Sequence, residues 1–219
     1  NIHQYEVQIM KKLVIIGAGG LGREVLQYVK DINKESSEYE ILGFIDENKS
    51  LWGSKLNGAY VIGDFSKLSE LKEQIHAVCA VANPEMKKAL VKAGHDKGLI
   101  YVNIVHPLAY VADDVNMGEG IIVGPYTVIS TNADIGDHVI INPQCGIGHD
   151  TKIDSYTTLY WNVNLAGFTY VEKAVEIGSK AFIKQNVKIG YESIIGAGAV
   201  VTKDVKPGSK VVGVPAREL

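Results

Sequence analysis

The 219-residue chain lacks several features that would place it in a specialised class of protein. It has only two cysteines, Cys79 and Cys145, which sit in apolar surroundings at no disulfide or metal-binding spacing. We expect both to be small core residues in a reducing compartment. No apolar run approaches the roughly 20 residues of a membrane-spanning helix, and no signal-peptide pattern is visible. These absences predict a soluble, cytoplasmic protein with no membrane insertion.

The chain also lacks a strong excess of either charge. It has 22 Lys and Arg against 25 Asp and Glu, for a net charge of −3 at pH 7. This balance gives no electrostatic reason to expect a nucleic acid or an anionic membrane as a partner. Residues 1–9 precede a Met-Lys-Lys start at Met10. We treat them as an extension, native or artificial, that is not part of the fold.

Residues 10–104 alternate between strand and helix patterns. We expect strands at 12–16, 39–46, 77–82 and 99–105, and helices at 23–34, 66–74 and 84–94. Pro84 stands where proline is favoured, in the first turn of the last of these helices. Such alternation predicts a small Rossmann-like α/β domain, with about four parallel strands and helices on the sheet's faces.

From Val105 to Val201 the sequence follows a strict six-residue period. Every sixth residue is aliphatic or Met, at 17 consecutive positions, and the fourth residue after each is small or β-branched. This period fits a hexapeptide parallel β-helix, with three hexads in each triangular coil. Seven of the residues that directly follow the aliphatic position are glycines, which we interpret as tight corners with positive φ. We place this domain at 105–206 and a C-terminal tail at 207–219.

Four segments carry a resemblance to a known family. They are "VIIGAGGLGREV" (14–25), "LGFIDEN" (42–48), "VANPEM" (81–86) and "IGAGAVVTKDVKPGSKVVGVPA" (195–216). With the hexapeptide repeats they resemble bacterial sugar acetyltransferases of the NeuD/PglD family, over residues 11–217. The resemblance implies a left-handed β-helix, a homotrimer, and acetyl-CoA as cosubstrate without a metal. It also implies transfer to the amine of a nucleotide-linked amino sugar of the UDP-4-amino-sugar type, for bacterial surface glycan biosynthesis.

The resemblance also implies roles for individual residues. The family's general base is a corner histidine followed by an acidic residue, which places the catalytic pair at His149 and Asp150. Because Ile147 takes the inward direction, the His149 side chain should project outward, where an imidazole can take a proton from an acceptor. Asp150 would fix the tautomer of that imidazole. The residues matched to coenzyme A are Thr158, Gly167, Ser179 and Ala197, with the Gly167 amide stabilising the oxyanion.

The glycine-rich turn "GAGGLG" (17–22) fits the G-x-G-x-x-G pattern of dinucleotide-binding domains. An NAD-linked oxidoreductase is nevertheless disfavoured, because the domain has too few strands and the second half offers no hydride chemistry. In the resembling family this end of the sheet holds the nucleotide sugar, with phosphate at the helix N-terminus. The matched residues here are Gly19, Gly20, Leu21, Asp46, Glu47 and Ala82.

Other interpretations stay open at this point. His138 also lies on a corner and is a second candidate for the base, whereas His106 should cap the domain junction. A zinc site of converging histidines is not expected, because His138 and His149 have no third histidine partner in the repeats. The acceptor could instead be a hydroxyl, as in sialic-acid O-acetylation. A non-catalytic trimeric scaffold that binds nucleotide sugars is the alternative of another class, and Trp161 is a candidate contact to a neighbouring subunit.

Overall fold

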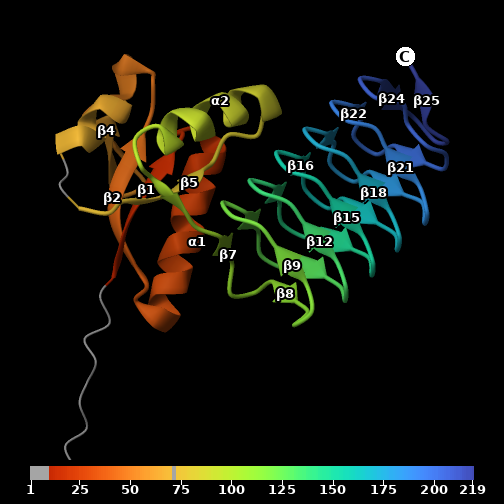
Figure 1. Cartoon of the computed structure of the whole chain (residues 1–219), viewed down its shortest axis with the longest axis horizontal. Coiled ribbons are helices and arrows are strands. Elements are labelled where there is room, and N and C mark those ends of the chain that lie inside the picture. Colours follow the sequence, from red (N-terminus) through yellow and green to blue (C-terminus); the bar gives the residue numbers. More distant parts are fainter. Residues whose placement is uncertain (1–9, 71–72) are drawn as a thin grey trace, which may run out of the picture.

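The computed structural model describes residues 10–70 and 73–219, so the extension at 1–9 and positions 71–72 lie outside the described residues. Figure 1 shows an N-terminal α/β domain at one end of a long prism of stacked strands, with the C-terminus at the far end. The prism and the α/β domain are the two architectures that the sequence predicted. In the described part of the chain, no helix combines the length and apolar character of a membrane span.

The N-terminal sheet has six strands in the order β3-β4-β2-β1-β5-β6, rather than about four. They are β1 (Lys11–Ile16), β2 (Tyr39–Ile45), β3 (Lys55–Leu56), β4 (Ala59–Gly63), β5 (His76–Cys79) and β6 (Ile100–Tyr101). The unpredicted β3 and β4 form an antiparallel hairpin around Asn57 and Gly58, which have φ of 48° and 98°. Asn-Gly is the residue pair that tight hairpin turns favour, so the signal was present in the sequence.

Two α-helices flank this sheet. α1 (Gly20–Ser36) begins three residues before the expected start, inside the glycine-rich turn. α2 (Pro84–His95) begins at the predicted proline, and Asn83 caps it by accepting a hydrogen bond from the Met86 amide at 3.0 Å. Short 3-10 turns lie at η1 (Lys49–Leu51) and η2 (Phe65–Glu70). The segment 66–74 therefore forms a 3-10 turn over its described start, where an α-helix was predicted.

The prism is built from two-residue strands that wind through three sheets. Face 1 contains β7 (Ile104–Val105), β10 (Ile122–Val123), β13 (Ile140–Ile141), β16 (Thr158–Leu159), β19 (Glu176–Ile177), β22 (Ile194–Ile195), β24 (Lys210–Val212) and β25 (Arg217–Glu218). Face 2 contains β8 (Tyr110–Val111), β11 (Val128–Ile129), β14 (Gly146–Ile147), β17 (Asn164–Leu165), β20 (Phe182–Ile183) and β23 (Val200–Val201). Face 3 contains β9 (Asn116–Met117), β12 (Asp134–Ile135), β15 (Lys152–Ile153), β18 (Tyr170–Val171) and β21 (Lys188–Ile189).

The second residue of each strand from β7 to β23 is the periodic aliphatic residue or Met117, and these side chains form the prism's interior. The predicted strand at 99–105 is divided between β6 in the N-terminal sheet and β7 in the prism. The segment 207–219, expected to be a tail, adds β24 and β25 to face 1. Hexapeptide periodicity therefore located the interior, and the fold is a left-handed β-helix behind a small α/β domain.

The interpretation of the seven repeat glycines was wrong. None of them has positive φ. The left-handed residue stands two positions later at most corners, as at Asp150 and Asn186. The glycines are needed for close approach between coils instead: a Cβ at Gly148 would lie 2.6 Å from the amide nitrogen of Gly167, and a Cβ at Gly178 would lie 2.5 Å from that of Ala197. Contacts that short are not tolerated, so stacking rather than backbone conformation selects glycine there.

The two domains share a hydrophobic core along the first coils of face 1. The outward-facing Ile104, Ile122 and Ile140 belong to the same buried cluster as Leu13 and Val25 of the N-terminal domain. His106 is buried beside this junction, with its Nε2 3.3 Å from Oδ2 of Asp31 in α1. The chain's own α/β domain therefore covers face 1 along its first coils.

Candidate active site

His149 lies on the corner between β14 of face 2 and β15 of face 3. Ile147, two residues before it, points inward and is 2% exposed, whereas the His149 side chain is 48% exposed. Its Nδ1 lies 2.8 Å from Oδ2 of Asp150. An ionised carboxylate only accepts hydrogen bonds, so Nδ1 carries the proton and the Nε2 lone pair is free to accept one. This arrangement is the one expected of a general base and the residue that orients it.

Asp150 is itself held in place. It adopts a left-handed backbone conformation with φ of 55°, which Asp tolerates better than most residues. Its Oδ1 accepts a hydrogen bond from Nδ2 of Asn132, one coil earlier on the same corner, at 3.2 Å. One carboxylate oxygen therefore faces the imidazole and the other faces Asn132. Asn132 could not be identified from the sequence, because corner residues follow no pattern that marks such contacts.

Gly167 stacks on His149 one coil further along the same corner. A Cβ at Gly167 would come within 2.7 Å of both Cε1 and Nε2 of the imidazole. The neighbouring Phe168 ring packs edge-to-face on the imidazole, with 5.0 Å between ring centroids. Phe168, another residue that sequence reasoning missed, therefore forms a wall beside His149. Within the described chain the Gly167 amide donates no hydrogen bond, and the residue itself is buried.

A shallow hollow on face 2 reaches this corner. It is lined by Val128, Gly146, Ile147, Gly148, Asn164, Leu165, Ala166 and Phe182. Gly148 directly precedes His149 and Ala166 directly precedes Gly167, so the hollow opens beside the imidazole. A ligand lying along face 2 would thus pass the base.

The other residues matched to coenzyme A are divided by the structure. Ser179 and Ala197 stack on the opposite edge of face 2, in the same column as Trp161, which is 44% exposed. Thr158 is in a different position from the one expected. It points outward from face 1, where the N-terminal domain covers it, and it is 0% exposed. Its hydroxyl donates to the Ala82 carbonyl at 2.7 Å, so Thr158 belongs to the domain junction and not to an open groove.

The glycine-rich turn leaves the start of α1 open. Gly19 is the N-cap and Gly20 the first helical residue, and a Cβ at either would meet no atom within 4 Å. No side chain caps this end and its first turn has no acidic residue. By contrast, a Cβ at Gly22 would lie 1.9 Å from the Gly17 carbonyl oxygen, so that glycine is required by packing. The open N–H groups at Gly19 and Gly20 suit an anion such as phosphate.

The other predicted nucleotide-sugar residues surround this helix start. Asp46 directly follows β2, and its two carboxylate oxygens accept from the amides of Ala18 and Asn48, each at 2.8 Å. Asp46 therefore shapes the glycine-rich turn. Glu47 beside it is exposed, and Leu21 packs partly against the core. Ala82 follows β5, the strand next to β1 in the sheet.

The predicted site residues thus form three groups in a single chain. The nucleotide-sugar residues lie at the ends of β1, β2 and β5, the catalytic pair and Gly167 on one edge of face 2, and Ser179 and Ala197 on its other edge. The contacts of His149 are all with its own corner of the prism. The described part of one chain does not bring the three groups into one pocket.

His138, the second candidate base, is buried in the domain junction and is 2% exposed. Burial lowers the pKa of its imidazole to about 4. Its Nε2 lies 3.7 Å from Oε1 of Glu119, and His95 Nε2 lies 3.4 Å from the same oxygen. Sequence reasoning missed this convergence, because His95 comes from α2. A metal-bound histidine normally donates its second N–H to an acceptor, and Nδ1 of His138 has none within the described chain.

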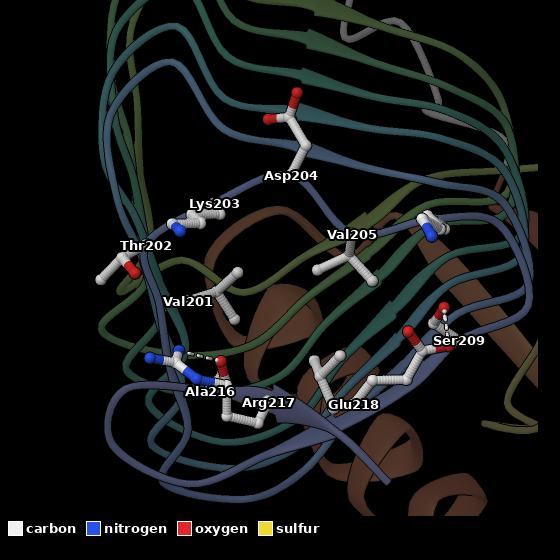
Figure 2. Close-up of a pocket in the computed structure, with 11 residues that line it drawn as sticks. Val201, Thr202, Lys203, Asp204, Val205, Ser209, Ala216, Arg217 and Glu218 are labelled. Atoms are coloured by element: carbon white, nitrogen blue, oxygen red, sulfur yellow. Dashed lines mark hydrogen bonds between the residues drawn. The ribbon is translucent and has the colours of Figure 1, made fainter.

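Figure 2 shows a second pocket, at the C-terminal end of the prism. Its floor contains Val201 and Val205 from the last layer of the interior, and β25 crosses one side with Arg217 and Glu218. None of its lining residues is among the predicted site residues. This pocket is the open end of the prism, partly closed by the C-terminal strands.

A β-helix prism behind a small α/β domain, with an outward histidine–carboxylate pair on a corner, places the chain among the hexapeptide-repeat proteins. A family model described as the PglD N-terminal domain matches residues 12–93. Over 214 residues the chain is 36% identical to the GDP-perosamine N-acetyltransferase of Escherichia coli O157:H7, covering 94% of this chain and 95% of the relative. The chain belongs to the sugar acetyltransferase family of the NeuD/PglD type.

Solved structures agree with this assignment. PerB from Caulobacter crescentus, in complex with CoA and GDP-perosamine, superposes with a TM-score of 0.88 at 28% identity, covering 96% of this chain and 98% of that one. WeeI from Acinetobacter baumannii has a TM-score of 0.88 at 31% identity, covering 96% and 100%. The acetyltransferase domain of PglB from Neisseria gonorrhoeae, in complex with acetyl coenzyme A, has a TM-score of 0.88 at 28% identity, covering 96% and 100%.

Proposed function

We propose that this chain transfers the acetyl group of acetyl-CoA to the amine of a nucleotide-linked amino sugar, with His149 as general base. The observation that carries the proposal is the geometry at one corner: an outward imidazole oriented by Asp150 and stacked on Gly167, whose amide has no hydrogen-bond partner among the described residues. Nε2 removes the proton from the amine as nitrogen attacks the thioester carbonyl. The Gly167 N–H stabilises the oxyanion that forms, and the thiolate of CoA leaves.

Direct transfer is favoured over an acyl-cysteine intermediate. Cys79 and Cys145 are both buried, and burial raises the pKa of each thiol to about 12. A thiol that stays protonated and inaccessible is a poor nucleophile. The amine and the thioester would therefore meet in a ternary complex.

For the acceptor we propose a GDP-linked amino sugar in place of the UDP type expected from the sequence. The relative that matches along nearly the whole chain is named for GDP-perosamine, and PerB was solved with the same sugar nucleotide. The open helix start at Gly19 and Gly20 is where the diphosphate would bind, with Asp46 shaping the turn and Glu47 and Ala82 beside it. Cytoplasmic location and a role in surface glycan biosynthesis stay predictions.

The three separated groups of site residues favour a site shared between copies of the chain. Face 2 is the exposed apolar face of the prism, and its edges carry the His149 column and the Ser179 column. Packing this face against neighbouring copies would bring the edge of one prism beside the opposite edge of another. The trimer implied by the sequence resemblance is therefore also what completes the proposed groove for coenzyme A.

The experiment is a thiol-release assay with acetyl-CoA and a panel of amino sugars linked to GDP, UDP or dTDP, with free sialic acid as the hydroxyl acceptor. We expect release with a GDP-linked amine, and a turnover about 10²–10⁴ lower for His149→Ala, the usual contribution of a general base. His95→Ala is the matched control, because its side chain has the same 48% exposure. Undiminished turnover in His149→Ala would remove the base from the mechanism. Release only with sialic acid would favour O-acetylation, and absence of coenzyme A binding would favour the scaffold.

A further inference from the structure

Lys87 has an unusual environment for a lysine. It lies in α2 and is 0% exposed, and within the described chain no other Asp, Glu, Lys or Arg side chain is buried. Burial lowers the pKa of its amine to about 7, an effect that the charge of Glu176 partly offsets. Among the described residues its Nζ has hydrogen-bond acceptors but no ion-pair partner. Burying an amine in this way is costly, and an apolar side chain of similar size would avoid the cost.

The Lys87 amine reaches across the domain junction. Nζ donates to Oγ1 of Thr158 at 2.9 Å and, more weakly, to the Thr157 carbonyl at 3.4 Å. The Thr158 hydroxyl in turn donates to the Ala82 carbonyl at 2.7 Å. One hydroxyl of the prism therefore accepts from α2 and donates to the loop that precedes α2. These hydrogen bonds restrict the side chains of Lys87 and Thr158 and the backbone at Ala82.

The residues joined by these hydrogen bonds, Ala82 and Thr158, belong to the two domains that form the proposed site. Ala82 lies in the loop after β5, which is predicted to receive the nucleotide sugar, and it directly precedes Asn83, the N-cap of α2. Thr158 begins β16, the strand that follows β15 and the His149 corner in the same coil. The hydrogen bonds of Lys87 thus fix the acceptor loop against the coil that carries the base.

We infer that Lys87 is a positioning residue for the acceptor: through Thr158 it holds the Ala82 loop in the place where the nucleotide sugar binds. This inference rests on the proposed function. A merely structural lysine would behave differently, because its replacement by methionine would remove a buried polar group and leave the kinetics unchanged. If Lys87 positions the acceptor loop, the same replacement should leave the unfolding midpoint unchanged or higher and should weaken acceptor binding.

The test is Lys87→Met, studied by thermal unfolding and by steady-state thiol release. Methionine has a similar length and no buried amine, so we expect the unfolding midpoint to stay the same or rise. We expect KM for the nucleotide sugar to rise by up to about 10-fold, the effect of losing one net hydrogen bond. KM for acetyl-CoA should stay unchanged, because Lys87 touches none of the residues that line face 2.

Two Thr158 variants keep the test independent of how methionine packs. Thr158→Val removes the hydroxyl and should raise the same KM, whereas Thr158→Ser keeps the hydroxyl and should restore it. Thr127→Val is the control, because Thr127 is equally buried but donates within the prism, to the Asn142 carbonyl at 3.0 Å. If the wild type is active and the acceptor KM is unchanged in Lys87→Met and Thr158→Val, the inference about Lys87 is wrong and the proposed function stands. A wild type that releases no thiol with any acceptor would overturn the proposed function and the inference together.

Discussion

At the scale of single residues, the imidazole of His149 is defined by the groups around it more than by its own position in the repeat. Asp150 fixes Nδ1, Phe168 packs against the ring, and Gly167 leaves the space in which the ring lies. The absence of a side chain at position 167 therefore matters as much as the presence of the histidine. Gly167 has two roles in the proposed mechanism, as oxyanion donor and as the gap that admits the imidazole.

Gly167→Ala separates space from backbone chemistry. Alanine keeps the amide N–H, but its Cβ would lie 2.7 Å from Cε1 and Nε2 of His149 and must displace the ring. We expect kcat to fall at least about 10-fold, since a small misplacement of a reacting group is enough for such a loss. The unfolding midpoint should change little, because His149 is half-exposed and can move outward. Wild-type kcat in Gly167→Ala would show that the ring does not need its present position.

At the scale of elements, the prism strands could be predicted because burial repeats with the period of the coil. Ile147 and its equivalents are inward in every turn, so the six-residue pattern records them directly. Outward residues follow no such pattern, so the sequence could not indicate that Thr158, which was matched to coenzyme A, is buried against α2. Asn132 and Phe168 escaped prediction for the same reason. The repeat glycines were misinterpreted because contacts between coils are invisible within one hexad.

The junction between α2 and the prism contains a group whose titration should be measurable. Burial lowers the pKa of His138 to about 4, against its ordinary value of 6.5. Between these values the unfolded chain binds more protons than the folded one, so the free energy of unfolding falls as pH decreases from about 6.5 to about 4. The groups around the ring are Asp137, Glu119, His95, Tyr101 and Tyr156. His138 alone should account for about 2 kcal/mol lost between pH 7 and pH 5.

His138→Asn isolates the contribution of His138 to the pH dependence of the free energy of unfolding. Asn132 occupies the equivalent corner position with φ of 57°, close to the 54° of His138, so asparagine suits the backbone. The variant loses packing against Tyr156 at every pH, but its stability should depend less steeply on pH between 7 and 5 than that of the wild type. Urea unfolding at several pH values measures the difference. Parallel pH profiles for the two proteins would mean that His138 titrates normally in the fold.

At the scale of the whole molecule, the three faces of the prism have different surroundings. Face 1 is covered by the N-terminal domain along its first coils. Face 3 presents polar side chains, where the amines of Lys152 and Lys188 lie over the Tyr170 ring at 5.4 Å and 5.2 Å from its centroid. Face 2 exposes large apolar side chains, at Tyr110 (63%), Val128 (47%) and Phe182 (42%). Only the surroundings of face 2 suggest burial in an assembly.

Because face 2 exposes a large apolar surface, assembly and activity should be lost together when that surface is changed. Phe182→Lys places a charge in the apolar hollow of face 2, so we expect a trimeric wild type to become a monomer in sedimentation equilibrium. Thiol release should be lost with it, because one chain keeps the His149 edge and the Ser179 edge apart. Lys152→Ala, on face 3, is the control and should change neither the mass nor the rate. An active monomer would show that one chain is sufficient and would place coenzyme A on a single prism, beside His149.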